Sequence, residues 1–281
     1  MGIIDFILNL AGLLLWFNWR SLRFDPLGQR TPATLIGTLR RAEPRRLRRW
    51  HLLAALGGLL LLRAVLYWQI GPGIGWAAGK LNLGVIVLSI PIQEDWTGLG
   101  RICLFSLFSF GLVLGVFYLW LLLFSILAGP EPFHRLVRMQ LGPVDRWPRA
   151  IKLFLPLIFV AWSWWLASWL LEWCGIIPGP IPTAHRIEAS LVIGLGSYLA
   201  WQYVAGALLV LYLLNSYIYF GGHPFWNYVT AEAQTLLRPL RAVPLRAGKA
   251  DFAPVVGIAL VFLLAELAER GLAALYLRLP V

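Results

Sequence analysis

Ionisable side chains within apolar runs are the residues of this sequence with the clearest chemical potential. Arg63 lies in the middle part of the apolar segment 52–70. Glu266 and Glu269 lie in the apolar segment 252–276. A charged side chain at such a depth in a bilayer is costly, so it needs an oppositely charged partner or a water-filled path. At about 1.5 Å rise per residue, Arg63 and Glu266 would lie at similar depths in antiparallel helices. The sequence therefore predicts a contact between Arg63 and Glu266 or Glu269, which either fixes helix packing or forms part of an ion or proton path.

Three other positions point to structural chemistry. Asp251 comes directly before the segment 252–276. Its carboxylate would cap the start of a helix there and would be attracted by the positive end of the helix dipole. Cys103 and Cys174 would lie at the outer ends of consecutive antiparallel segments. An oxidising compartment would permit a disulfide between them, but two separate thiols are the favoured interpretation.

The residue patterns of enzymes and of metal or cofactor sites are missing from the sequence. It has no G-x-S-x-G nucleophile motif, no phosphate-binding Walker loop and no dinucleotide fingerprint. Its two cysteines make no C-x-x-C pair, and its four histidines are not spaced for metal or haem binding on one helix face. We therefore expect no catalytic residues, no metal and no cofactor.

Composition and charge distribution indicate a membrane protein. Of the 281 residues, 59% are hydrophobic and only 13% are charged. The apolar runs do not alternate as the strands of a transmembrane β-barrel would. The net charge of +11 comes mainly from arginines and lysines in three loops, 18–51, 129–152 and 221–251. This asymmetry places the three basic loops in the cytoplasm, against anionic lipid headgroups, and needs no nucleic acid partner.

Six apolar segments predict an all-α integral membrane protein with five to six transmembrane helices in antiparallel hairpins. A span requires about 20 residues, which five of the segments provide. The first segment is short and contains Asp5 and Asn9, so it either spans or lies in the plane of the membrane. The segments are 3–17, 52–70, 102–128, 153–173, 189–220 and 252–276.

The three basic loops share one design. Each contains an amphipathic stretch that ends near a proline and is followed by basic residues that lead into the next apolar segment. In loop 18–51 the predicted helix runs from Thr31 toward Pro44, whereas loops 129–152 and 221–251 open with Pro-Phe pairs. Such helices are predicted to lie flat at the cytoplasmic interface with their arginines toward the headgroups.

The segment from Gly71 to Gly100 is the least regular part of the sequence. Its apolar run, Leu83 to Ile92, is too short to span a bilayer. It could be re-entrant, a strand pair or a half-helix. We expect a packed lid on the non-cytoplasmic side rather than a pore loop, because a pore loop would have a duplicated partner in the chain.

The run from Gly221 to Pro254 combines three motifs that lead into the last apolar segment. They are a Pro-Phe pair, an Arg-Pro-x-Arg-x-x-Pro block and a Gly-x-x-Asp-x-x-Pro block. Their order resembles the YggT family of bacterial and plastid membrane proteins, most closely over 217–264 and more faintly over 123–160. The residues of these motifs on which the resemblance depends are Pro224, Phe225, Arg238, Pro239, Arg241, Pro244, Asp251 and Pro254.

The resemblance implies two modules behind an N-terminal extension. The extension is 1–100, the first YggT-like module is 101–180 and the second is 181–281. YggT-like proteins are integral membrane proteins without established enzymatic activity, so the resemblance implies a non-enzymatic scaffold or assembly factor of the bacterial inner membrane. Its partner would be another membrane protein or a second copy. Two alternatives remain: a transporter or channel for a small solute or ion, and an accessory subunit of a respiratory or photosynthetic complex.

Overall fold

The computed structural model describes most of the chain outside its longest basic loop. The described residues are 2–21, 49–71, 78–91, 96–127, 133–218, 223–243, 245–247 and 250–278. The amphipathic helix predicted from Thr31 to Pro44 lies outside these ranges, as do Pro132 and Pro244.

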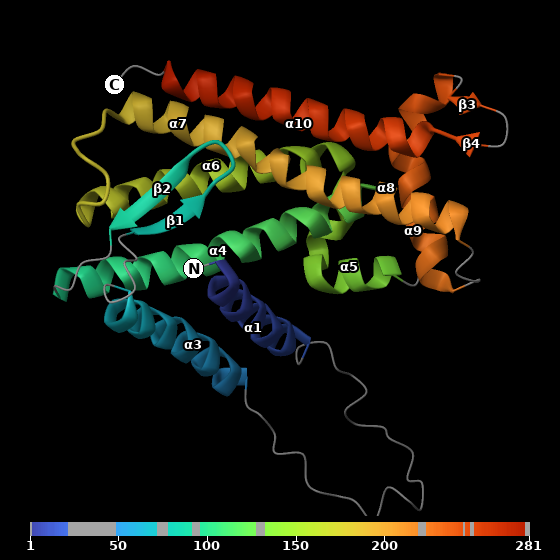
Figure 1. Cartoon of the computed structure of the whole chain (residues 1–281). Helices are drawn as coiled ribbons and strands as arrows, with labels where there is room; N and C mark the ends of the chain where they lie inside the picture. Colours follow the sequence, from blue (N-terminus) through green and yellow to red (C-terminus); the bar gives the residue numbers. More distant parts are fainter. Residues whose placement is uncertain are drawn as a thin grey trace, which may run out of the picture. The chain divides into compact units, whose positions relative to one another are not determined.

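Helices dominate the described residues, and two short hairpins interrupt them (Figure 1). The long helices are α1 (Gly2–Ser21), α3 (Arg49–Ile70), α4 (Trp96–Leu127), α6 (Arg149–Trp173), α7 (Thr183–Gly196), α8 (Trp201–Tyr217) and α10 (Ala253–Leu277). The shorter elements are β1 (Ala78–Asn82), β2 (Val87–Pro91), α5 (Phe133–Leu141), η3 (Gly142–Arg146), η4 (Ser197–Ala200), α9 (Pro224–Leu236), η5 (Arg238–Ala242), β3 (Arg246–Ala247) and β4 (Ala250–Asp251).

Five helical segments among the described residues are long and apolar enough to cross a membrane. They are Ile3–Arg20, Trp50–Ile70, Gly98–Leu127, Arg149–Trp173 and Thr183–Tyr217. The helical part of the predicted fold is thereby confirmed. The sequence allowed the first segment either to span the membrane or to lie in its plane. In the structure this segment has the length and composition of a span. The last segment forms α10, a helix of 25 residues, but its three charges, Glu266, Glu269 and Arg270, keep it outside this set.

The chain forms two compact units. Unit 1 comprises Met1–Gly79 and Ile90–Leu114, and unit 2 comprises Lys80–Ser89 and Gly115–Val281. The division therefore passes through α4, whereas the sequence placed a boundary near residue 100. In unit 1, α1 packs against α3. Gly12 lets α1 approach α4 closely, because a Cβ there would lie 2.7 Å from the Phe110 ring of α4, whereas Leu56 of α3 would be 3.5 Å away.

In unit 2, α6 and α7 pack together, and α10 runs beside α8 and α7 (Figure 1). The 3-10 turn η4 separates α7 from α8 and leaves carbonyl groups for side-chain donors. Two indoles make a reciprocal connection there: Trp120 Nε1 donates to the Ala200 carbonyl at 2.9 Å, and Trp201 Nε1 donates to the Leu119 carbonyl at 2.9 Å. These bonds satisfy backbone groups that lipid could not satisfy.

The crossing of α6 and α7 depends on Gly194. A Cβ at this position would lie 2.8 Å from the Leu157 carbonyl oxygen and 3.0 Å from the Ala161 Cβ. Gly194→Ala is therefore expected to lower the free energy of unfolding by about 1–3 kcal/mol through overpacking, as measured by thermal unfolding in detergent. The control is Gly271→Ala, where an added Cβ meets no described atom within 4 Å. Equal melting temperatures for the two variants would contradict this account of the crossing.

The two described basic loops repeat one arrangement, as predicted. Helix α5 begins at Phe133 and continues into η3, and helix α9 begins at Pro224 and continues into η5. A proline opens each 3-10 turn. Helix α9 buries Tyr228, Val229 and Ala233. Its apolar face packs on α8 and on the C-terminal part of α4.

The irregular segment after α3 contains a strand pair, which was one of the three forms that the sequence allowed. Strands β1 and β2 form a two-stranded sheet whose turn includes Gly84, at φ 87°. The tip of this hairpin belongs to unit 2 and packs closely on the end of α7, because a Cβ at Gly196 would lie 2.4 Å from Val85 Cγ2. The lid on the non-cytoplasmic side stays a prediction.

The predicted cap of the last helix is wrong by one residue. Helix α10 begins at Ala253, and its N-cap position is Phe252, which provides no side-chain cap. Asp251 instead belongs to β4, opposite Arg246 in β3. The backbone is still extended at Asp251, because the residue is engaged in strand pairing.

Candidate functional site

The strongest candidates for a functional site are three clusters of buried charge. We call them the Arg63 network (Asp5, Asn9, Arg63, Tyr67 and Ser109), the Asp145 cluster (Ser125, His134, Arg138, Asp145 and Lys152) and the Arg186 pair (Glu172 with Arg186). The first belongs to unit 1 and the other two belong to unit 2.

The Arg63 network joins the three helical segments of unit 1. Arg63 is only 1% exposed, and its Nη2 lies 2.7 Å from Asp5 Oδ1. Arg63 Nη1 donates to Asn9 Oδ1 at 2.8 Å. The Tyr67 hydroxyl donates to Asp5 Oδ1 at 2.5 Å, and Asn9 Nδ2 donates to Ser109 Oγ at 3.3 Å. Helices α1, α3 and α4 are thus connected through one buried guanidinium.

Helical spacing explains why these side chains meet. Asp5 and Asn9 are four residues apart on α1, and Arg63 and Tyr67 are four residues apart on α3, so each pair occupies one helix face. The rings of Tyr67 and Phe105 also lie 5.5 Å and 5.4 Å from the Arg63 guanidinium carbon, a distance at which cation–π attraction contributes. The guanidinium is therefore enclosed by acceptors and aromatic rings.

The acid predicted for Arg63 was wrong. The structure gives Arg63 the carboxylate of Asp5, whereas Glu266 pairs with Arg270 one helical turn away, at 2.7 Å. Glu269 is exposed on the same helix. The physical reason is that α1 is helical from Gly2 to Ser21 and packs beside α3. This packing brings Asp5 level with Arg63. The signal that could have revealed this was the polar pair Asp5 and Asn9 at helical spacing in an apolar segment.

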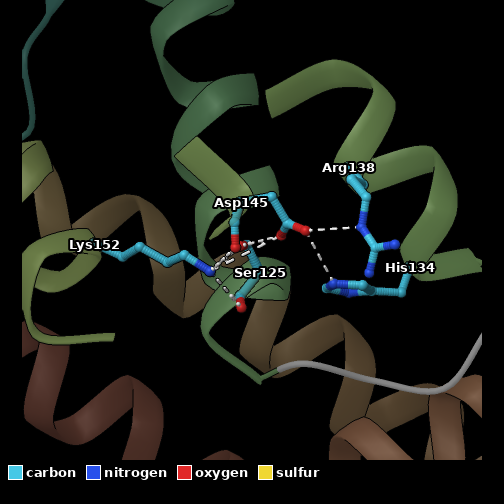
Figure 2. A network of polar contacts seen from close by, with 5 residues as sticks. All are labelled: Ser125, His134, Arg138, Asp145 and Lys152. Atoms are coloured by element: carbon cyan, nitrogen blue, oxygen red, sulfur yellow. Dashed lines mark hydrogen bonds and ion pairs between the residues drawn. The ribbon is translucent and has the colours of Figure 1, made fainter. Parts of the chain in front are cut away.

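The Asp145 cluster connects the end of α4, helix α5, η3 and the start of α6 (Figure 2). The Asp145 side chain is 4% exposed. Its Oδ1 accepts from Ser125 Oγ at 2.6 Å, and its Oδ2 accepts from Arg138 Nε at 3.2 Å. Lys152 Nζ donates to the Asp145 carbonyl at 2.6 Å and to Ser125 Oγ at 2.8 Å. His134 Nε2 lies 3.4 Å from Asp145 Oδ2.

Asp145 is held in its charged form. Burial alone would raise the pKa of this carboxyl, but hydrogen bonds from Ser125 and Arg138 outweigh it, and the nearby basic groups of His134 and Lys152 add to them. The pKa of Asp145 therefore lies below its ordinary value. A carboxylate with a low pKa and occupied oxygens is a weak general base, so this cluster is suited to holding elements together rather than to proton transfer.

This pKa shift predicts a dependence of stability on pH. An acid whose pKa is lowered by folding stabilises the folded state above its unfolded pKa of about 3.9 and loses that contribution as the pH falls through the lower folded value. Wild type is therefore expected to lose stability below about pH 4, and Asp145→Asn is expected to lack this component. Thermal unfolding of both proteins from pH 7 to pH 3 measures it. A constant stability difference between them over this range would contradict the assignment.

The Arg186 pair lies where α6 ends and α7 begins. Arg186 is 3% exposed, and its Nη2 pairs with Glu172 Oε2. The guanidinium carbon lies 4.0 Å from the centre of the Trp169 ring, a close cation–π contact. This pair was not predicted from the sequence. The available signal was a pair of opposite charges at the two ends of the short connection 174–182.

The motif residues of the run 221–254 have mainly local structural roles. Pro224 and Phe225 open α9, where His223 Nδ1 accepts from the Phe225 amide at 3.2 Å. Arg238, Pro239 and Arg241 belong to η5. Pro254 is buried in the first turn of α10, where it needs no backbone donor.

Two further sequence predictions concern a metal centre and the two cysteines. Among the described residues, no group of three or more His, Cys, Asp or Glu side chains could hold a metal ion. Cys103 belongs to unit 1 and Cys174 to unit 2, and both are half-buried. That they stay two separate thiols remains a prediction. Comparisons with models of known protein families, with characterised proteins and with solved structures give no match for this chain.

Proposed function

We propose that this chain is a multi-span protein of the bacterial inner membrane that acts as a non-enzymatic scaffold or assembly factor. One observation supports this function best: every buried Lys or Arg among the described residues has an acid partner on a different element. The pairs are Arg63 with Asp5, Lys152 with Asp145, and Arg186 with Glu172.

Such pairs favour a fixed architecture. A transport pathway requires charged groups that exchange partners with water or solute during the cycle. Here Arg63 binds Asp5 and Asn9 together, and Lys152 donates to three oxygen atoms. Separating a buried ion pair leaves an uncompensated charge, which opposes rearrangement. The network is therefore better suited to a rigid docking platform than to alternating access.

The proposed orientation places the basic loops in the cytoplasm. Helix α5 exposes Arg135 and Arg138 beside the apolar side chains of Leu136 and Met139. Basic and apolar groups on one exposed surface favour binding at an interface with anionic headgroups. Helix α9 and η5 would occupy the same face, where Arg238 is exposed.

Co-purification in a mild detergent tests the proposal. The tagged full-length chain is expected to retain a defined membrane-protein partner, and deletion of its gene is expected to impair assembly of the partner's complex. If the partner is a respiratory or photosynthetic subunit present in constant proportion, the chain is an accessory subunit. Recovery of the lone chain together with normal complex assembly after deletion would refute the scaffold function. Solute flux in proteoliposomes that is lost in Arg63→Ala would instead establish transport.

A further inference from the structure

The C-terminal half of α10 is a long helical surface that the rest of unit 2 hardly covers. In the first turns of α10, Pro254 and Gly257 are buried, and Gly257 fits closely against Leu237. Beyond Gly257 no described residue of α10 is fully buried, and the Phe262 ring lies close to Gly206 of α8. The large apolar side chains exposed there, with their exposed fractions, are Phe262 (43%), Leu263 (55%), Leu264 (62%), Leu267 (57%), Leu275 (47%) and Leu277 (83%).

Three charges lie within this exposed apolar surface. Glu266 and Arg270 pair at 2.7 Å, with their side chains 53% and 75% exposed. Glu269 is also exposed, and no described residue neutralises it. Two carboxylates and one guanidinium leave one net negative charge. At about 1.5 Å per residue from Ala253, Glu269 would lie in the outer third of a bilayer core about 30 Å thick.

Lipid is a poor neighbour for such a surface. Charged side chains in a membrane core almost always face other protein or water and pair with opposite charge. The apolar residues around Glu269 would pack equally well against a lipid tail or a helix, so the charge decides between these neighbours. A neighbouring helix with a cation at the same depth satisfies both features.

We propose that the C-terminal half of α10 is a docking face for a transmembrane helix of a partner protein that carries a Lys or Arg opposite Glu269. This inference rests on the proposed scaffold function and specifies the chemistry of its partner. A second copy fits less well, because each copy brings the same net negative charge to the interface. A cationic helix brings the charge to zero and covers the leucines.

A defined peptide tests the proposal. Full-length protein labelled with a donor dye is reconstituted in liposomes with an acceptor-labelled helix of leucine and alanine that carries a single Arg in the outer third of the bilayer. Matched peptides carry Leu or Glu at that position. Energy transfer is expected to show at least tenfold tighter binding of the Arg peptide than of the Leu peptide, with the Glu peptide weakest. Glu269→Gln is expected to abolish this preference, and Glu188→Gln, at an exposed acid of α7, is expected to retain it.

Three results of the peptide experiment would overturn the inference. The first is equal binding of all peptides, which would mean that lipid satisfies Glu269. The second is a preference for Arg that survives Glu269→Gln. The third is energy transfer between two copies of the chain that Glu269→Gln removes, which would make this face a self-interface. If a native partner still co-purifies with Glu269→Gln, the scaffold function stands and only the docking face is refuted.

Discussion

Asp5→Asn is expected to lower the free energy of unfolding by about 3–5 kcal/mol, because it leaves the buried Arg63 without a counter-ion. Arg63 is 1% exposed, and Asp5 is its acid partner at 2.7 Å. The same carboxylate accepts the Tyr67 hydroxyl, so the substitution weakens two contacts between α1 and α3. Unfolding in mixed micelles with increasing dodecyl sulfate, followed by tryptophan fluorescence, measures the loss.

A charge exchange separates the ion pair from other effects of the substitution. The double variant Asp5→Arg with Arg63→Asp is expected to be more stable than either single variant, because the pair is restored with its polarity reversed. Glu188→Gln, at an exposed acid, is the control and should change stability by less than about 0.5 kcal/mol. If Asp5→Asn unfolds like wild type, α1 does not dock on α3 through this pair.

Asp145→Asn is expected to cost a similar amount, about 3–5 kcal/mol, in unit 2. Lys152 is 5% exposed and lies 3.9 Å from the Asp145 carboxylate, so it would lose its only acid partner among the described residues. Arg138 and His134 would each lose their contact with this carboxylate. Thermal unfolding at pH 7 measures the effect.

Removal of both charges tests whether the cost arises from the unpaired lysine. Asp145→Leu combined with Lys152→Met should recover much of the stability lost in Asp145→Leu alone, because a buried pair can often be replaced by apolar residues of similar volume. Arg149→Gln, at an exposed position in the first turn of α6, should be nearly neutral. A double variant no more stable than Asp145→Leu would place the cost in packing and hydrogen bonds instead.

The helices could be predicted from the sequence because their signals are local. Long apolar runs produce helices at the positions expected for α3, α4, α6 and α10, and the Pro-Phe pairs mark the starts of α5 and α9. Each of these features depends on residues within a few turns of each other. The in-plane position of α5 and α9 and the resemblance to the YggT family stay predictions.

The partners of the buried charges could not be predicted in the same way, because they depend on which helices become neighbours. Similar depth was a sound criterion for Arg63, but two acidic helices satisfied it and the sequence favoured the wrong one. Asp145 lies in a basic loop, where its burial depends on the fold of α5 and η3 around it. The Asp251 cap failed for a smaller reason: a two-residue strand extends the backbone up to the helix.

The proposed function requires that the chain cross a bilayer with its basic loops on one side. Replacing Cys103 and Cys174 by alanine and introducing single cysteines at the exposed positions Arg146, Arg238 and Thr183 allows this to be measured with a membrane-impermeant maleimide on intact spheroplasts. The account predicts labelling at position 183 and protection at positions 146 and 238 until the membrane is opened. Labelling of position 146 or 238 from outside, or a compact chain in buffer without lipid or detergent, would contradict it.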